Sequence, residues 1–478
     1  MCWALRKNCR YSLMKANVKS RFNKQNIGRG IRYLKRNGLS AALFKASERL
    51  SRDGDEADYE AWLGTHLPDE ETLKEQRQTQ FKSRYKISIL VPAYETSPVF
   101  LQELIESVVA QSYTEWELCI ADGSSSDVVK NCVMDLVGRY CGEIGCNRIK
   151  YQKLDKNYGI SVNSNKALEM ATGDYVGLLD HDDLLAPNAL FEVVSMLQTG
   201  ICEEGCVIHN KIRAVYSDED KIDGHTGRHF DYHKKPEFNL DLLRTNNYIC
   251  HFFVVSSSVA KKTGGFRTEF NGAQDHDFIL RCVENAPKDS IRHIPKVLYH
   301  WRAHVDSTAD HPESKMYAYD AGKRAIEAHL ERMLIDAQVL YTPHLGFFRV
   351  KYAPGNETVT IMSKAEWDLV KQSDLTGIDE DYIMIMNDNL KALTPSWQAE
   401  LTGHLRRSEV GAVAGKILDR KNCIESAGYT KNEEGKPTAN FKGLNRHYSG
   451  YMHRANLQQE VDALPLDCMM VKDRKSVV

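Results

Sequence analysis

Residues 86–122 read KISILVPAYETSPVFLQELIESVVAQSYTEWELCIAD, and this stretch decides the fold. It opens with a short apolar run that ends at a proline, as expected of a buried parallel strand. The middle part, residues 98–111, has the apolar spacing of a helix, and a second apolar run begins at Trp116. Because parallel neighbours need a crossover connection, the stretch predicts a strand–helix–strand unit.

The same alternation continues along the chain. Residues 147–159 predict a third strand, residues 161–173 a helix closed by Gly173, and residues 174–180 a fourth strand. Repeated alternation of strands and helices is typical of an α/β fold with a doubly wound sheet. Ligands of such sheets bind outside the carboxyl ends of the strands.

Polar residues follow three of these predicted strands. They are Pro92, Tyr94 and Glu95 after the first strand, Asp122 and Ser124 after the second, and Asp180, Asp182 and Asp183 after the fourth. Because the carboxyl ends of parallel strands share one edge of a sheet, we expect these loops to converge on one crevice.

The turn DHDD at residues 180–183 carries the most chemistry. Two carboxylates one residue apart can face one divalent cation, and hard oxygen ligands suit Mg²⁺ or Mn²⁺. Mg²⁺ usually completes its coordination shell with substrate phosphates, so a nucleoside diphosphate is the natural partner. The structural alternative is that Asp182 or Asp183 caps the helix that begins at Pro187.

A set of motifs in order between residues 85 and 330 resembles the inverting glycosyltransferases of family 2. The motifs are ISILVPAYE, QSYTEWELCIADGSSSD, GISVNSNKAL, ATGDYVGLLDHDD, YSDEDKID, GGFRTEFNGAQDHDFILR and HIPKVLYHWRAHVDSTA. The chain is most similar to the rhamnosyl- and galactosyltransferase type that builds bacterial surface polysaccharides. The resemblance implies a GT-A fold with a mixed sheet, a nucleotide-sugar donor, and Mn²⁺ or Mg²⁺ held by the aspartate turn.

The resemblance also implies roles for single residues at the strand ends. Asp182 corresponds to the metal ligand, Asp180 to an acid that contacts the ribose or the metal, and Asp183 to a residue that supports them. The other implied donor contacts are the nucleoside loop Pro92, Tyr94 and Glu95, the base-contacting Asp122 with Ser124 beside it, and Asn165 near the diphosphate.

The motif GAQDHDFILR at residues 272–281 supplies the second half of the implied machinery. In the family, the second residue of an acid–Asp pair at the start of a helix is the general base. Here Gln274 replaces the first acid and Asp275 occupies the position of the base. A carboxylate there accepts a proton from the acceptor hydroxyl as it attacks the anomeric carbon. Asp277, about 200° further around the helix, is the competing candidate, and the structural alternative for Asp275 is a helix cap.

The motif YHWRAHVDSTA at residues 299–309 is less specific. The resemblance implies that Arg302 or His304 contacts the diphosphate or the metal, and it leaves open which of His300 and His304 reaches the metal. Trp301 is a candidate for contact with the acceptor.

The motif YSDEDKID at residues 216–223 adds three consecutive acids next to a predicted strand. Carboxylates hold sugar hydroxyls well, and Asp218 is the second candidate for contact with the acceptor. A solvated acidic loop is the alternative for Glu219 and Asp220.

A chain of 478 residues is expected to form several domains. We expect a basic helical region over residues 1–84, a catalytic GT-A domain over 85–340, and a second, incomplete GT-A-like domain over 341–478. The last of these rests on the similarity of residues 380–405 to 173–197. Its turn reads Asn387-Asp388-Asn389, so we expect no independent catalysis there, whether this copy is degenerate or truncated.

The first fifty residues carry about a dozen Lys and Arg against one acid, Glu48, although the formal net charge of the chain is −2. Such a segment predicts an anionic partner, either a membrane surface or nucleic acid, and a solvated helical face is the alternative. We expect no nucleic-acid binding, because no recognition helix or aromatic-studded basic sheet accompanies the charge. Peripheral attachment to a membrane through the basic segment is the preferred interpretation.

No window approaches the apolar length of a membrane span, and charges interrupt the N-terminus before a signal peptide develops. The twelve cysteines include no C-x-x-C pair, which predicts neither a zinc site nor a disulfide framework. This pattern is typical of a reducing cytoplasm, so we expect a cytoplasmic protein on the inner face of the plasma membrane.

Together these features predict a metal-dependent inverting glycosyltransferase. It would move a hexose or deoxyhexose from a nucleotide-diphosphate sugar to a hydroxyl of a growing O-antigen, capsule or similar glycan, with a lipid-linked acceptor left open. A nucleotidyltransferase would need a Gly-rich phosphate loop, which VPAYETSP lacks. A non-catalytic glycan-binding or scaffold protein would leave Asp182 and Asp275 unexplained.

Overall fold

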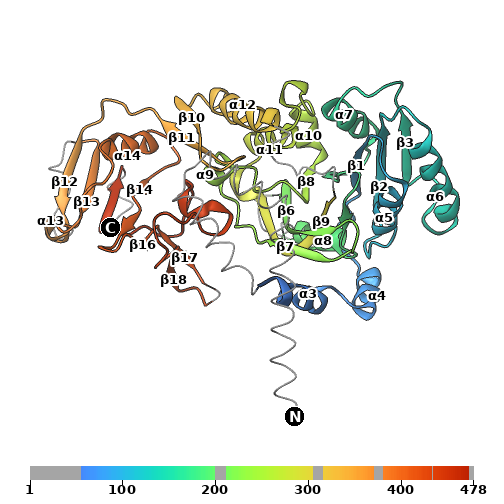
Figure 1. Ribbon diagram of the computed structural model, residues 1–478, viewed down its shortest axis with the longest axis horizontal. Coiled ribbons are helices and arrows are strands. Elements are labelled where there is room, and N and C mark those ends of the chain that lie inside the picture. Colours follow the sequence, from blue (N-terminus) through green and yellow to red (C-terminus); the bar gives the residue numbers. More distant parts are fainter. Residues whose placement is uncertain (1–54, 200–210, 305–315, 371–379, 433, 473–478) are drawn as a thin grey trace, which may run out of the picture. The chain divides into compact units, whose positions relative to one another are not determined.

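The computed structural model describes residues 55–199, 211–304, 316–370, 380–432 and 434–472 (Figure 1). The chain divides into two compact units, and each is described on its own. Within the described residues, the smaller unit comprises Lys416–Ala427 and Ala439–Asn456, and the larger one lies within Glu56–Gly415, Gly428–Thr438 and the segment that begins at Leu457.

The larger unit is built on a nine-stranded sheet with the strand order β3-β2-β1-β4-β8-β6-β9-β5, and β7 pairs with β6. The strands are β1 Ile87–Ala93, β2 Trp116–Asp122, β3 Ile149–Lys153, β4 Tyr175–Leu178, β5 Leu184–Leu185, β6 Ala214–Asp223, β7 His229–His233, β8 Phe253–Ser256 and β9 Ile291–Ala303. The pairs β3–β2, β2–β1 and β1–β4 are parallel, as the sequence predicts.

The remainder of this sheet makes it mixed. Strand β8 runs antiparallel to β4 and β6, whereas β9 runs parallel to β6 and β5 antiparallel to β9. Figure 1 shows β1, β2 and β3 at one end of this sheet. The prediction of a mixed, doubly wound α/β sheet is therefore confirmed.

Alternation of side chains along β1 explains why helices cover both faces of the sheet. Ile87, Ile89 and Val91 pack in one core with α5, α6 and α8, whereas Leu90 packs on the opposite face with α7 and α11. All these side chains are buried, which explains why β1 is apolar along its length except at Ser88. The helices of this part are α5 Pro98–Val109, α6 Val128–Ile144, α7 Ile160–Met170, α8 Ala189–Gln198, α9 Leu240–Leu243, α10 Ser257–Lys262 and α11 Gln274–Glu284, with 3-10 turns η2 Thr268–Phe270 and η3 Lys288–Ser290.

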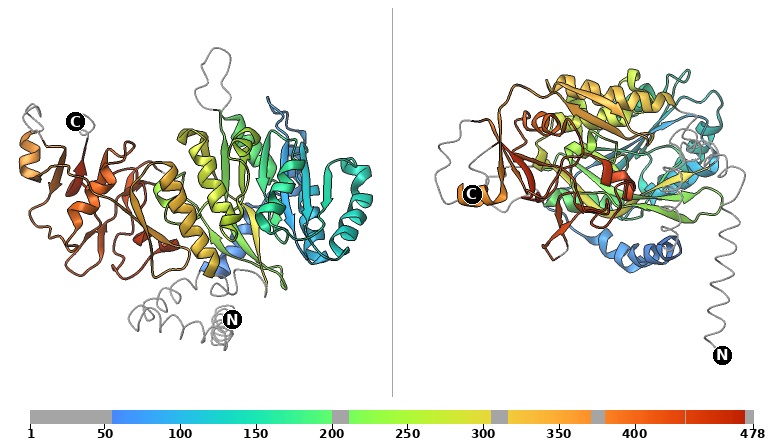
Figure 2. Two further views of the ribbon diagram at one scale, coloured as in Figure 1. Left: turned by 90° about the horizontal axis from the view of Figure 1, so that it is seen from above. Right: turned by 60° about the vertical axis from the view of Figure 1, so that its left-hand side comes forward.

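The expected domain boundary at residues 340 and 341 falls inside a hairpin. Strand β10, Ala337–Tyr341, pairs antiparallel with β11, Phe348–Tyr352. Val350 and Tyr352 join the same core as Phe278 of α11 and Ile326 of α12, Met316–Arg332. Figure 2 shows α11 and α12 side by side. The core of the first sheet therefore extends past the expected boundary, at least to Tyr352.

Residues 359–471 contain a smaller four-stranded sheet with the order β12-β13-β19-β14. Its elements are β12 Val359–Ser363, α13 Lys364–Val370, β13 Tyr382–Met386, α14 Trp397–Leu405, β14 Ala412–Ala414 and β19 Cys468–Val471. Strands β12 and β13 are parallel, and α14 follows β13 as α8 follows β4. At the end of β13, Asn387 Nδ2 donates to Asp467 Oδ1 at 3.2 Å, so this amide is engaged within the protein. That this sheet is a degenerate copy of the first one stays a prediction.

The remaining elements are short. Strands β15, Ile417–Leu418, and β16, Ile424–Ser426, form a hairpin within the smaller unit, which also holds the 3-10 segment η6 Tyr451–Asn456. Strands β17, Tyr429–Lys431, and β18, Pro437–Ala439, form another two-stranded sheet.

Helices α3, Asp55–His66, and α4, Glu70–Gln78, precede the first strand. Tyr59 and Leu63 of α3 are buried and pack against Val297 of β9. The basic residues 1–50 lie outside the described residues, so membrane attachment through them stays a prediction. Among the helices that the structure describes, none combines the length and apolar composition needed to cross a bilayer.

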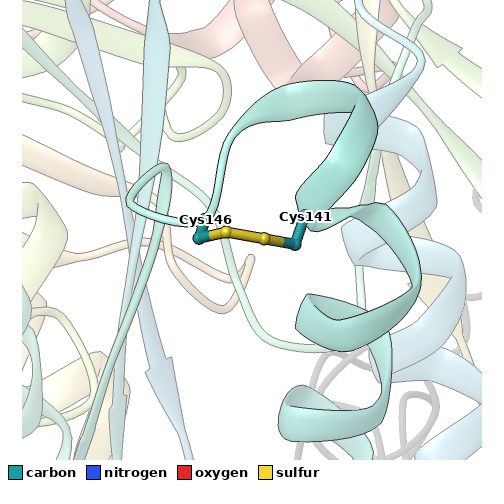
Figure 3. Close-up of a disulfide and its surroundings, with 2 residues drawn as sticks. All are labelled: Cys141 and Cys146. Carbon is teal, nitrogen blue, oxygen red and sulfur yellow. A yellow bond between two sulfur atoms is a disulfide. The ribbon is translucent and has the colours of Figure 1, made fainter.

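Cys141, in the last turn of α6, and Cys146, just after the helix, form a disulfide (Figure 3). The cysteine pattern, which has no C-x-x-C pair, does not predict this disulfide, and a C-x4-C spacing is no recognised signal of one. The turn at Gly145, which has φ of 87°, brings the two cysteines together.

Glu117 of β2 ties three strands together from a buried position. Its carboxylate is paired with the ammonium groups of Lys86 and Lys150, and it accepts hydrogen bonds from Ser88 Oγ at 2.7 Å and Thr172 N at 2.6 Å. Burial raises the pKa of Glu117, but these partners outweigh burial and lower the pKa to about 2.

We expect Glu117→Gln to lower the free energy of unfolding at pH 7 by about 2–3 kcal/mol. Because the pKa of Glu117 is depressed on folding, its contribution is complete above the unfolded value of about 4.3 and is lost as the pH falls towards 2. Denaturant titrations at pH 7 and pH 3 should therefore show a smaller difference between variant and wild type at pH 3. Glu115→Gln, which removes the exposed partner of Arg84, is the control and should cost less than about 0.5 kcal/mol. An equal loss for both variants, or one independent of pH, would contradict this account.

Candidate active site

The end of β2 holds Asp122 in a fixed orientation. Ser124 N donates to Asp122 Oδ1 at 2.8 Å, while Tyr151 Oη and Lys153 Nζ lie 2.7 and 3.0 Å from Oδ2. Burial raises the pKa of Asp122, but these hydrogen bonds outweigh burial and hold it below its usual range. The carboxylate is therefore ionised at neutral pH. No motif in the sequence indicates Tyr151 and Lys153, which the parallel register of β2 and β3 places beside Asp122.

The loop after β1 is linked to the loop after β2. Glu95, which has φ of 46°, accepts hydrogen bonds from Ser125 N and Ser125 Oγ at 2.7 and 2.8 Å. Its own N–H donates to Ser124 Oγ at 2.7 Å. Pro92 is buried within β1, and Tyr94 is 47% exposed beside this link. The two loops therefore meet, and the exposed Tyr94 ring is available to a ligand.

The aspartate turn after β4 is anchored by Asp183. This residue is fully buried, and its carboxylate accepts hydrogen bonds from Tyr299 Oη at 2.5 Å and Arg302 N at 2.7 Å. Burial, and then the charges of Asp182 and Asp180, raise the pKa of Asp183 well above its usual range. Asp183 thus supports the turn from inside, and no helix cap is needed to explain it.

Asp180 and Asp182 are the accessible acids of this turn, with side chains 50% and 20% exposed. His181 between them hydrogen-bonds with Thr96 Oγ1 at 2.9 Å, which joins the turn to the loop after β1. The three strand-end loops that we expected to converge are therefore connected by direct contacts.

Arg302, near the end of β9, contacts other groups of the protein through its guanidinium. Its Nε donates to the carbonyl oxygen of Asp182 at 2.6 Å, and a terminal nitrogen lies 2.7 Å from Glu103 Oε2. Its guanidinium also stacks over Phe100 at 4.4 Å. This buried side chain contacts the aspartate turn, and its contact with the diphosphate stays a prediction.

Of the two histidines left open by the sequence, His304 lies at the turn. Its Nε2 is 2.8 Å from Asp182 Oδ2, whereas His300 Nδ1 is 2.6 Å from Asp220 Oδ1. His304 therefore stays the candidate for a third metal ligand, and His300 belongs to a separate buried network.

Asp275 lies in the first turn of α11 and is partly exposed. The N-cap of this helix is Ala273, so Asp275 does not cap it. Its Oδ2 accepts a hydrogen bond from Asn247 Nδ2 at 2.7 Å, and Cys250 Sγ lies 3.6 Å from the same oxygen.

Asp277, the competing candidate for the base, is fully buried. Its carboxylate is paired with the guanidinium groups of Arg267 and Arg281. Burial raises the pKa of Asp277, but the two arginines outweigh burial and lower it. Asp277 is thus a structural ion-pair partner with no access to an acceptor.

A short loop joins the aspartate turn to Asp275. His251 Nε2 lies 3.7 Å from Asp180 Oδ2 and 3.5 Å from Cys250 Sγ, which in turn contacts Asp275. His251 Nδ1 is 3.2 Å from Glu219 Oε2, and its ring stacks on Tyr299. Two residues of one loop therefore span the distance between the predicted metal acids and the predicted base.

The three consecutive acids of YSDEDKID, Asp218, Glu219 and Asp220, lie inside β6, not in a solvated loop. Asp218 is fully buried and hydrogen-bonds with His293, Tyr232 Oη and Lys235 N at 2.7–2.8 Å. These contacts engage its carboxylate within the protein, and its contact with an acceptor stays a prediction. Trp301 is half-buried, with Lys221 Nζ over its ring at 5.2 Å, and its ring lies 5.9 Å from that of His251.

Asn165 holds the loop before Asp275 in place. Its side-chain amide forms hydrogen bonds with both backbone groups of Phe266. It donates to the carbonyl at 2.8 Å and accepts from the N–H at 2.7 Å. The side chain therefore connects α7 to the GGF loop, and its place near the diphosphate stays a prediction.

Two groups of side chains within the described residues have the composition of a metal site. In the first, Asp180, Asp183 and His251 each offer one ligand atom, and these atoms lie within 4.8 Å of one another. Asp180 is common to this group and to the predicted ligands Asp182 and His304. Because Asp183 is buried and already accepts two hydrogen bonds, the accessible oxygens of Asp180 and Asp182 fit a hard cation better.

The second group is Asp220, His229 and His300. The Nδ1 atoms of His300 and His229 lie 2.6 and 2.9 Å from the two carboxylate oxygens. Ligand atoms of a tetrahedral metal site are about 3.3 Å apart, so these separations fit hydrogen bonds. Tyr59 Oη adds a further hydrogen bond at 2.7 Å, and we assign this group to the packing of α3 on the sheet.

Residues 88–264 match the family model described as glycosyl transferase family 2. The match places this segment in that family.

Several relatives extend beyond this segment. An uncharacterized protein, y4gI, of Sinorhizobium fredii is 31% identical over 451 residues, which cover 81% of this chain and 48% of the relative. The O-antigen biosynthesis protein RfbC of Myxococcus xanthus is 26% identical over 432 residues, covering 78% of this chain and 32% of the relative. Chondroitin synthase of Escherichia coli is 28% identical over 224 residues, covering 47% of this chain and 30% of the relative. The chain thus spans less than half the length of each.

Among solved structures, Staphylococcus aureus TarS 1–349 aligns at 20% identity with a TM-score of 0.38, covering 51% of this chain and 65% of its own. A score at this level is too low to support an inference.

Proposed function

We propose that this chain transfers a hexose or deoxyhexose from a nucleoside-diphosphate sugar to a hydroxyl group of a growing surface glycan. The observation that carries the proposal is the loop containing Cys250 and His251, which contacts Asp275 at one end and Asp180 at the other. A cation-binding turn and a proton acceptor on either side of one small site suit a single displacement at an anomeric carbon.

The chain's own residues supply binding and proton transfer. Tyr94, Glu95 and Asp122 would bind the nucleoside, since they gather where the loops after β1 and β2 meet. Asp275 would accept the proton of the acceptor hydroxyl while its oxygen bonds to the anomeric carbon. The bond from the anomeric carbon to the phosphate oxygen breaks, and the nucleoside diphosphate leaves.

Asp182, Asp180 and His304 would hold Mn²⁺ or Mg²⁺. Two carboxylates, half and one-fifth exposed, with an imidazole nitrogen 2.8 Å from one of them, form a donor set that suits such a cation. When bound, the cation supplies positive charge that stabilises the departing diphosphate.

The kind of glycan is inferred from two relatives. The names of RfbC and of chondroitin synthase refer to polysaccharide synthesis, and their alignments cover 78% and 47% of this chain. We therefore propose a polysaccharide acceptor. Peripheral attachment to a membrane through residues 1–50 would bring the site to a lipid-linked form of it.

The proposal predicts that the purified chain releases a nucleoside diphosphate from at least one nucleotide sugar when Mn²⁺ is present. A panel of uridine-, guanosine- and thymidine-diphosphate sugars, with an oligosaccharide acceptor, would identify the donor. Removing Mn²⁺ with EDTA should abolish release, and adding it back should restore release. Release of inorganic pyrophosphate from a nucleoside triphosphate and a sugar phosphate would point to a nucleotidyltransferase. Glycan binding with no turnover of any donor would point to a scaffold protein.

A further inference from the structure

We infer that Asn247 is a positioning residue for Asp275, an inference that rests on the proposed function. Asn247 lies in the loop between α9 and β8 and donates from Nδ2 to Asp275 Oδ2 at 2.7 Å. The length is that of a strong hydrogen bond to a charged acceptor. Nothing in the sequence motif around Asp275 points to this residue, which stands 28 positions earlier.

The contacts of the Asp275 carboxylate are asymmetric. Asn247 Nδ2 and Cys250 Sγ both contact Oδ2, at 2.7 and 3.6 Å. Within the described residues, no hydrogen bond reaches Oδ1. One oxygen is therefore fixed to the protein, and the other is left to accept the proton of an acceptor hydroxyl. Without Asn247 the carboxylate would be free to rotate about its χ2 torsion, and the fraction of time in a reactive orientation would fall.

Asn247 is itself held in place by its own loop. Its Oδ1 accepts a hydrogen bond from Cys250 N at 3.3 Å, so the amide cannot turn over without losing this contact. The next residue, His251, contacts Asp180 and Glu219. The loop thus fixes the orientation of the base relative to the aspartate turn. A residue that positions the base should affect the turnover number and leave donor affinity unchanged.

The test uses the full chain, the donor found in the panel, Mn²⁺ and the oligosaccharide acceptor. Asn247→Asp keeps the size of the side chain and removes the donated hydrogen bond, and Asn247→Ala removes the side chain. We expect both variants to lower kcat by about 10–100-fold, with the donor Kd measured by calorimetry unchanged within twofold. Asn246→Ala is the matched control, because the buried Oδ1 of Asn246 has no hydrogen-bond partner in the described structure.

A second measurement separates positioning from a merely structural role. In the Asp275→Asn background, replacing Asn247 should cause no further loss of the residual rate, because its effect acts through Asp275. An equal loss in both backgrounds, or a kcat within twofold of wild type for Asn247→Asp, would overturn the inference. If Asn247→Ala does not fold, Asn247→Asp decides the matter. If Asp275→Asn itself keeps normal turnover, the proposed base is wrong, an outcome distinct from a failure at Asn247.

Discussion

Replacement of Asp275 by asparagine is expected to lower kcat by about 10²–10⁴-fold. The variant keeps the shape of the side chain and its contact with the α9–β8 loop, but an amide cannot accept the proton of the acceptor hydroxyl. Because the hydrogen bonds of Asp275 in the described structure are with the α9–β8 loop and not with Glu95 or Asp122, the donor Kd should stay within about twofold of wild type.

Steady-state kinetics with the identified donor, together with calorimetry of donor binding in Mn²⁺, would check this result. Asp135→Asn, the same chemical change at an exposed position on α6, is the control and should leave both quantities unchanged. Turnover within tenfold of wild type for Asp275→Asn would show that another group accepts the proton.

Replacement of Asp182 by asparagine should have the second large effect, this time on donor binding. The substitution removes one accessible carboxylate from the aspartate turn and weakens the contact with His304. Loss of the cation would remove several kcal/mol of stabilisation of the diphosphate. We expect the donor Kd in Mn²⁺ to rise by about 100-fold or more.

Calorimetry with and without Mn²⁺ is the measurement. Wild type should bind the donor much more tightly with Mn²⁺, and Asp182→Asn should bind it equally weakly under both conditions. Asp135→Asn again serves as the control. Tight, Mn²⁺-dependent binding by Asp182→Asn would show that the cation is held elsewhere.

The predictable part of this site follows from local sequence. The strand–helix–strand unit at residues 86–122 fixes the parallel half of the sheet, and the rule that parallel strands end at one edge gathers Asp122 and the aspartate turn. The helix at Asp275 could be predicted from its motif. Each of these inferences needs only the order of elements along the chain.

The features of the site that the sequence does not predict depend on contacts between segments that are far apart in the chain. His251 reaches Asp180 because β8 pairs antiparallel with β4. The sequence pattern of residues 246–253 does not predict that pairing. The sequence leaves a solvated loop open for Glu219 and Asp220 of β6, because the groups that neutralise them are not adjacent in the chain. Asp218 hydrogen-bonds with His293, and Asp220 with His300, across 75 and 80 positions. A buried acid can be predicted only when its partner is known.

Contacts between distant segments also give two residues partners within the protein that the sequence did not predict. Arg302 and Asn165 have the residue types expected near a diphosphate, yet their polar groups are directed at the aspartate turn and at Phe266. Both still act on the site, because they hold the two segments that carry Asp182 and Asp275. A single sequence gives the residue type but not the direction of the side chain.

The most direct test of the central claim is the location of the cation. Crystals of the full chain grown with Mn²⁺ and the nucleoside diphosphate released in the panel would show Mn²⁺ by its anomalous scattering. We predict one Mn²⁺ coordinated by Asp182 and by the diphosphate. The Asp275 carboxylate should face the same site from the side opposite the aspartate turn. Mn²⁺ bound at Asp220, His229 and His300, or an Asp275 carboxylate turned to a different surface, would contradict the account.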